Sequence, residues 1–196
     1  MLGWGTRGTI ALFSSCKECK AISVYPFHSV FLDTCIVRYL ASFPSYFYEN
    51  GADEHEIERI RAIPNPSLQD DIFVLKALPD LFQRGFPHEI VVTSDVIAEL
   101  PPAARTYGDE LLNWCREMKF LNEYVPRNFF TSIADILDSS DRRLYLQAAA
   151  LGCDTFLTTD YKTIVSRRDR LPRHFARVLT PSEWWQEMRP WAGLAG

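Results

Sequence analysis

Four acidic residues occupy similar places in this chain, each beside a run of apolar residues. They are Asp33 at the end of Val-Phe-Leu-Asp, Glu99 at the end of Asp-Val-Ile-Ala-Glu, Asp141 ahead of an apolar helical pattern, and Asp160 at the end of Leu-Thr-Thr-Asp. Two carboxylates about 4 Å apart repel by roughly 4 kcal/mol at an effective dielectric constant near 20, so converging acids must either hold protons or share a divalent cation. If the fold brings the four together, the sequence predicts a metal-dependent enzyme.

The elements around these acids have to bring them to one place. Short apolar and β-branched runs predict strands at residues 30–32, 89–93, 155–158 and 177–179. Apolar residues at helical spacing predict helices at residues 34–41, 94–100 and 138–151. This alternation predicts a three-layer α/β/α fold with a mainly parallel central sheet. Ligand sites in such sheets lie beyond the carboxyl ends of the strands, which is where Asp33 and Asp160 fall.

The stretch between the first two strands is long and rich in proline. Helix-compatible segments at residues 54–62 and 70–81 predict a helical insertion after the first strand. Farther along, we expect an amphipathic helix at residues 109–120 and a short strand at residues 121–125. Thr180-Pro-Ser-Glu183 has the form of a capping box that opens a terminal helix.

Length and composition narrow the class of protein. The 196 residues, 47% of them hydrophobic, suffice for one sizeable core, and a net charge of -4 excludes nucleic-acid binding through overall positive charge. Five cysteines fit reduced thiols and predict a cytoplasmic protein. The sequence has no apolar run of the roughly 18 to 20 residues that a membrane span needs, so no membrane partner is expected. Cys16 and Cys19 form half a zinc site, but a structural or incidental role for the pair is favoured.

The motifs between residues 29 and 183 resemble those of the PIN-domain ribonucleases. Val30-Phe-Leu-Asp-Thr34 is similar to the family's first strand with its leading aspartate. Val92-Thr-Ser-Asp-Val-Ile-Ala-Glu-Leu100 is similar to the strand and helix that bring in the glutamate. Asp141-Arg-Arg-Leu-Tyr-Leu-Gln-Ala148, followed by Leu151-Gly-Cys-Asp-Thr-Phe-Leu-Thr-Thr-Asp160, resembles the family's helix, glycine turn, strand and T-x-D ending. The resemblance implies a PIN-like domain at residues 29–196, after an N-terminal extension at residues 1–28.

The resemblance also implies an activity. The chain would be a ribonuclease that cleaves single-stranded RNA with Mg²⁺ or Mn²⁺, and a toxin role would add an antitoxin-like protein partner. A homodimer is also expected. The metal ligands and catalytic residues would be Asp33, Glu99, Asp141 and Asp160, with Thr34 and Thr158 orienting a carboxylate or a water.

Several alternatives stay open. Asp138 lies near Asp141 and is a candidate for its place. Cys35 stands where the family usually has Asn or Ser, which favours a catalytically weak module that binds RNA or a protein. An aspartyl-phosphate phosphatase also places an aspartate after its first strand, but its usual second aspartate would fall at Cys35. Phosphate contacts are expected from a group of arginines that follow Asp160, namely Arg167, Arg168, Arg170 and Arg173.

Overall fold

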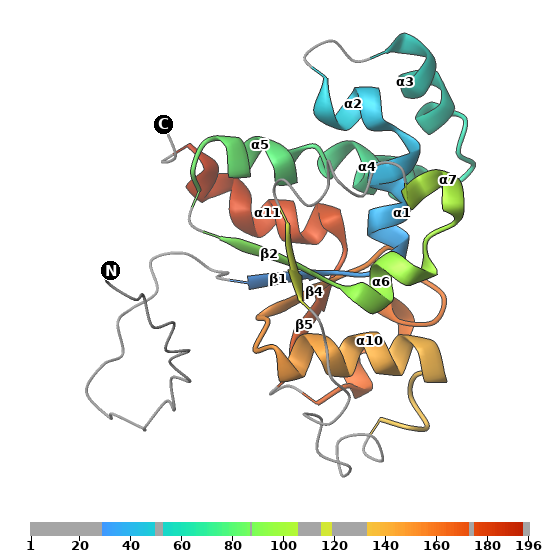
Figure 1. Ribbon diagram of the computed structural model, residues 1–196, viewed down its shortest axis with the longest axis vertical. Helices are drawn as coiled ribbons and strands as arrows, with labels where there is room; N and C mark the ends of the chain where they lie inside the picture. Colours follow the sequence, from blue (N-terminus) through green and yellow to red (C-terminus); the bar gives the residue numbers. More distant parts are fainter. Residues whose placement is uncertain are drawn as a thin grey trace, which may run out of the picture.

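A parallel β-sheet forms the centre of the molecule (Figure 1). The computed structural model describes residues 29–49, 53–86, 88–105, 115–118, 133–172 and 175–193. Over this part of the chain the sheet has five strands in the order β3-β2-β1-β4-β5, and every neighbouring pair is parallel. The strands are β1 (Ser29–Leu32), β2 (Glu89–Thr93), β3 (Arg116–Met118), β4 (Thr155–Leu157) and β5 (Arg177–Leu179).

Apolar side chains on both faces explain why these segments form a central sheet. Phe31 of β1 pairs in register with Val91 of β2 and Phe156 of β4, and all three are buried. The rings of Phe31 and Phe156 stack with their centroids 5.5 Å apart. Burial on both faces is typical of parallel strands between two helical layers, and the mainly parallel sheet predicted from the sequence is confirmed.

Helices cover both faces of the sheet, as expected for a three-layer arrangement (Figure 1). One layer contains α11 packed against α4, with α5 beside them, and α10 lies on the opposite face. The helices are α1 (Thr34–Ser42), α2 (Pro44–Tyr48), α3 (Glu54–Arg61), α4 (Pro66–Val74), α5 (Ala77–Gln83), α6 (Ser94–Glu99), α7 (Pro102–Arg105), α10 (Ser139–Ala150), α11 (Pro181–Ala192) and the 3₁₀ helix η2 (Val165–Arg170).

The strand order creates a switch point beside β1. The chain goes from β1 to β2 and β3 on one side, and later enters β4 and β5 on the other. In open α/β sheets the crevice beyond the carboxyl ends of two such strands is the usual ligand site. Asp33 follows β1 and Asp160 follows β4, so both acids lie at this end of the sheet.

The predicted helical insertion between β1 and β2 is present, with one correction. The segment predicted as a single helix at 70–81 is two helices, α4 and α5, separated at Leu75 and Lys76. Asn65 caps α4 by accepting hydrogen bonds from the amides of Ser67 and Leu68, and Pro66 occupies the first turn. The first helix therefore begins earlier than the apolar spacing indicated, because its capping signal precedes the apolar residues.

The helix predicted at residues 109–120 is wrong where the structure describes it. Residues 116–118 form β3, which pairs with β2 through Val91, Val92 and Thr93. Arg-Glu-Met has no β-branched residue, so its strand conformation follows from the pairing and not from local preference. The strand predicted at 121–125 and the extension at 1–28, with Cys16 and Cys19, lie outside the described residues.

Local capping signals were predicted correctly. Thr180 and Glu183 form both hydrogen bonds of a capping box at the start of α11. Gly152 ends the α10 segment with φ +72°, in the left-handed region that glycine adopts without strain. These two signals fix the ends of the helices that flank β4 and β5.

Candidate active site

Asp33 lies at the carboxyl end of β1 and is 5% exposed. Its Oδ1 accepts a 2.7 Å hydrogen bond from the amide of Thr34, which makes Asp33 the N-cap of α1. Its Oδ2 accepts hydrogen bonds from the hydroxyl of Thr158, at 2.6 Å, and from the thiol of Cys35, at 3.1 Å. The Asp33 amide also donates to the carbonyl of Leu157. These contacts fix the carboxylate against the end of β4.

Asp160 is held by the turn that follows β4. Its amide donates a 3.0 Å hydrogen bond to the Thr158 hydroxyl oxygen. Its Oδ1 accepts a hydrogen bond from the amide of Thr163 at 2.8 Å, and its Oδ2 lies 2.5 Å from the Thr163 hydroxyl oxygen. Thr158 thus contacts both Asp33 and Asp160, and brings the ends of two neighbouring strands into one hydrogen-bonded group.

Asp141 enters the site from the first turn of α10. Its Oδ2 lies 2.8 Å from the same Thr163 hydroxyl oxygen that contacts Asp160. Asp138 has a different function, because its Oδ1 accepts hydrogen bonds from the amides of Ser140 and Asp141 and so caps α10. Of the two alternatives that the sequence left open, the geometry places Asp141 beside Asp160.

The electrostatics of the three aspartates reflect burial and crowding. Burial raises the pKa of Asp33, the hydrogen bonds from Thr158, Cys35 and the Thr34 amide oppose this, and the charge of Asp160 adds to the rise. Burial also raises the pKa of Asp141 to about 6, against the hydrogen bond from Thr163, with further rises from the charges of Asp138, Asp33 and Asp160. The charges of neighbouring aspartates therefore make ionisation of Asp33 and Asp141 less favourable.

Glu99 is the last residue of the short helix α6. Its Oε2 accepts a 2.7 Å hydrogen bond from the Thr34 hydroxyl. Its Oε1 accepts hydrogen bonds from Ser140, at 3.1 Å, and from Arg143, at 2.7 Å. Glu99 therefore lies next to Asp33 through Thr34, but the guanidinium of Arg143 compensates its charge.

The donor set is chemically suited to a hard divalent cation. Mg²⁺ and Mn²⁺ take carboxylate oxygens, and Asp33, Asp141 and Asp160 offer them from three separate elements. As the side chains stand, no group of three or more His, Cys, Asp or Glu residues within the described ranges is arranged to hold a metal ion. The Thr163 hydroxyl contacts the carboxylates of both Asp141 and Asp160. The Thr158 hydroxyl contacts the Asp33 carboxylate and the Asp160 amide.

Cys35 takes part in the site as a hydrogen-bonding thiol. Burial and the charge of Asp33 raise the pKa of its thiol well above the ordinary range. It accepts a hydrogen bond from the amide of Thr159 at 3.2 Å while donating to Asp33. A protonated thiol is a poor nucleophile, so Cys35 has the contacts of a supporting residue.

Two of the three described arginines in the group that follows Asp160 are engaged within the protein. Arg167 donates to the Ile136 carbonyl at 2.8 Å, and Arg168 forms a 2.6 Å ion pair with Glu183. Arg170 ends η2 and is exposed, whereas Arg173 lies outside the described residues. Of the three described arginines, Arg170 therefore fits best the expectation of a cation exposed for RNA phosphates.

Two residues of the site were missed in the sequence. Thr163 lies three positions after Asp160, which is the spacing at which a capping aspartate side chain accepts a hydrogen bond from a backbone amide. Arg143 lies two positions after Asp141, and a charged residue on a helix surface gives no sign of its partner. Thr163 therefore has a local signal in the sequence. The contact of Arg143 with Glu99 depends on α6 lying near α10.

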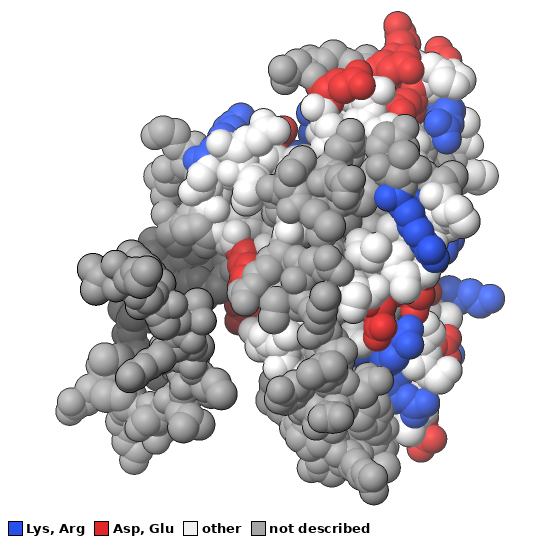
Figure 2. Space-filling view, viewed as in Figure 1, with Lys and Arg blue, Asp and Glu red and all other residues white. Residues whose placement is uncertain are grey.

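The surface near the site carries both signs of charge (Figure 2). In this view acidic and basic side chains lie next to one another at the right, beside α6 and the start of α10, and acidic side chains gather over α3 at the top. Among the residues coloured in this view, the charges near the site are therefore mixed in sign.

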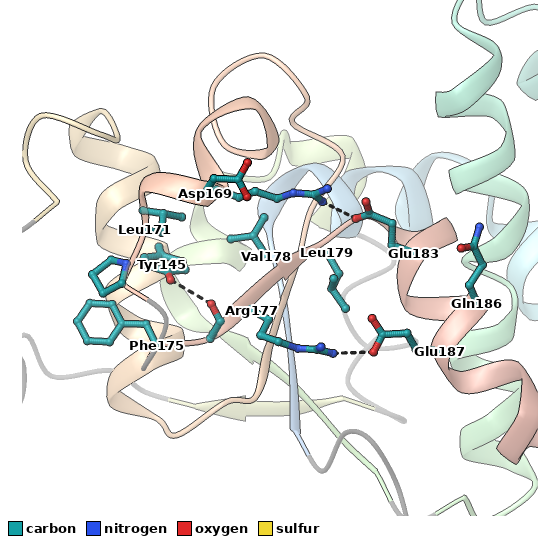
Figure 3. A pocket seen from close by; sticks show the side chains of 13 residues that line it. Tyr145, Asp169, Leu171, Phe175, Arg177, Val178, Leu179, Glu183, Gln186 and Glu187 are labelled. Carbon is teal, nitrogen blue, oxygen red and sulfur yellow. Dashed lines mark hydrogen bonds and ion pairs between the residues drawn. The ribbon is translucent and has the colours of Figure 1, made fainter.

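A separate cavity of about 540 Å³ lies along β5 (Figure 3). Tyr145 donates a hydrogen bond to the Ala176 carbonyl at one end, and the ion pair of Arg177 with Glu187 closes the other. The four acids of the site do not line it. Its two arginines, Arg168 and Arg177, form ion pairs with two glutamates that also line it.

Comparisons with known proteins assign no family to the chain. No helix in the described ranges is both long and apolar enough to cross a membrane. No protein-family model matches the sequence, no curated protein matches it, and no solved structure matches the fold. What can be argued about function therefore rests on the residues and geometry of the site.

Proposed function

We propose that this chain is a PIN-like, metal-dependent endoribonuclease that cleaves single-stranded RNA. One observation carries the proposal: Asp33, Asp141 and Asp160 come from β1, α10 and the turn after β4, and converge at the switch point of a parallel sheet. Burial, and then the charges of neighbouring aspartates, raise the pKa of Asp33 and Asp141. A divalent cation would relieve this repulsion, which is the physical reason to place one there.

Each acidic residue has a defined part in the proposal. Asp33, Asp141 and Asp160 would hold Mg²⁺ or Mn²⁺, and Glu99 would complete the acidic set. When bound, such a cation supplies charge neutralisation at a phosphodiester and activation of the attacking water. Thr34 and Thr158 orient the carboxylates by donating their hydroxyl hydrogens to Glu99 and Asp33.

The direct test is cleavage of a generic single-stranded RNA in the presence of Mg²⁺ or Mn²⁺. Asp33→Asn and Asp160→Asn should each lower the rate at least about 100-fold, because each removes a charged ligand while keeping the side-chain shape. Asp70→Asn is the matched control, because Asp70 is an exposed aspartate on α4. Cleavage that survives EDTA, or that is the same in all three variants and the unmodified protein, would contradict the proposal.

The ion pair between Arg143 and Glu99 favours a second candidate, a catalytically weak module that binds RNA or a protein such as an antitoxin. In this arrangement one of the four acids is already compensated without a cation. The same experiment separates the two functions. Binding of single-stranded RNA without cleavage, unaffected by Asp160→Asn, would support the binding module against the nuclease.

A further inference from the structure

Thr163 joins two acids of the site that belong to different elements. Its hydroxyl oxygen lies 2.5 Å from Oδ2 of Asp160 and 2.8 Å from Oδ2 of Asp141. The two carboxylate oxygens are therefore about 5.3 Å apart at most, the sum of these two distances. Thr163 thus sets how far the acid of α10 lies from the acid that follows β4.

The backbone around Thr163 fixes the position of this hydroxyl. The amide of Thr163 donates a hydrogen bond to Oδ1 of Asp160 at 2.8 Å. The amides of Ile164 and Val165 donate to the Asp160 carbonyl at 3.2 and 2.9 Å. Asp160 therefore shapes the turn that carries Thr163, and Thr163 in turn orients the carboxyl group of Asp160.

A threonine hydroxyl carries a single hydrogen, so it donates to only one of the two acids at a time. The other carboxylate is held beside it without a hydrogen bond from that group. Two carboxylates kept this close in a partly buried site repel each other. The Thr163 hydroxyl can offset the negative charge of only one carboxylate at a time, whereas a cation between the two would offset both.

We propose that Thr163 is a positioning residue for cation binding, which holds the carboxylates of Asp141 and Asp160 where both reach one divalent ion. This inference rests on the proposed metal-dependent function. Groups that orient metal ligands through hydrogen bonds typically change metal affinity or activity by about 10- to 100-fold when removed. Thr163 acts through the aspartates and has no other described side-chain partner in the site.

The test measures Mn²⁺ affinity by titration calorimetry, together with RNA cleavage, in the full chain. Thr163→Val keeps the shape of the side chain and removes the hydroxyl, so we expect Mn²⁺ affinity to fall about 10- to 100-fold. Thr163→Ser keeps the hydroxyl and should restore affinity to within about threefold of the unmodified protein. Ser166→Ala is the matched control, because the Ser166 hydroxyl in the same segment donates to the Lys162 carbonyl and is exposed.

A double-variant cycle shows whether Thr163 acts through Asp141. In an Asp141→Asn background, adding Thr163→Val should change Mn²⁺ affinity by less than about threefold, because the pair to be positioned is already lost. Thr163→Ala replaces Thr163→Val in both series if the valine variant does not fold. Equal affinity in Thr163→Val and the unmodified protein, or equal losses in the serine and valine variants, would overturn this inference alone. An unmodified protein that neither binds Mn²⁺ nor cleaves RNA would overturn the proposed function instead.

Discussion

The Thr158 hydroxyl oxygen lies 2.6 Å from Oδ2 of Asp33, and so joins the carboxyl ends of β4 and β1. The two residues are 125 positions apart in the chain. Thr158 is fully buried, and its hydroxyl oxygen also accepts the amide hydrogen of Asp160. This one side chain therefore aligns two of the acids on which the proposed function depends.

Thr158→Val should destabilise the protein and impair the site together. The substitution removes one hydrogen bond from the buried Oδ2 of Asp33 and one from the part-buried Asp160 amide. Leaving a buried group without its hydrogen bond typically costs about 1 to 3 kcal/mol. Urea unfolding measures the loss in stability, and Thr158→Ser is the control that keeps the hydroxyl. If the valine variant and the unmodified protein had equal unfolding free energies, the Thr158 hydroxyl would not contribute to stability.

Stability should depend on pH through Asp141. Its pKa is raised to about 6, so the folded protein keeps this proton to a higher pH than the unfolded chain does. The folded state thus binds more protons, and the contribution of Asp141 to stability declines as pH rises from about 4 to about 6, then stays level.

The comparison that isolates this effect is the difference in unfolding free energy between the unmodified protein and Asp141→Asn, measured in EDTA. We expect the unmodified protein to lose stability relative to Asp141→Asn as the pH rises from about 4 to about 6. Saturating Mn²⁺ should stabilise the unmodified protein more than Asp141→Asn above this range, because the cation binds the ionised carboxylate. A difference that is constant over the whole range would contradict the raised pKa.

Arg143→Ala should strengthen cation binding. Its guanidinium lies 2.7 Å from Oε1 of Glu99, and removing it leaves the carboxylate without its compensating charge. We expect Mn²⁺ affinity to rise several-fold, with little change in stability because the pair is partly exposed. Arg142→Ala is the control, and Glu99→Gln combined with Arg143→Ala should cancel the gain. Weaker Mn²⁺ binding by Arg143→Ala would show that the ion pair supports the site instead of competing with the cation.

Cys35→Ser should keep or improve the function of Asp33. A serine hydroxyl can donate to Oδ2 of Asp33 as the thiol does, and it is the stronger donor. Cys35→Ala removes the donor and should lower cleavage, while both variants fold. The ratio of kcat between the serine and alanine variants is the measurement, and a ratio near one would mean that this hydrogen bond has no part in positioning Asp33.

Much of the fold was predictable because its signals are local. The buried run before Asp33, the capping box at Thr180 and the glycine at 152 each act over a few residues, and the structure confirms all three elements. The strand β3 was not predictable, because Arg116–Met118 becomes a strand only by pairing with β2. The segment at residues 54–62 was predicted correctly as α3, whereas the helix predicted at 70–81 was misplaced because the Asn65 cap of α4 lies before the apolar pattern.

The sequence predicts those acids of the site that lie just after a strand. The rule that parallel strands end at one edge correctly brings Asp33 and Asp160 together. Whether Asp138 or Asp141 joins them depends on which carboxylate caps α10, and a spacing of three residues does not decide that. The Arg143–Glu99 pair spans 44 positions between two helices, so only their packing reveals it.

The most direct test of the account is the position of Mn²⁺ in crystals grown or soaked with the ion, located by its anomalous scattering. The account predicts a peak within about 2 to 2.6 Å of carboxylate oxygens from Asp33, Asp141 and Asp160. A peak bound elsewhere, or no peak at a concentration that supports RNA cleavage, would contradict a shared cation at these three aspartates.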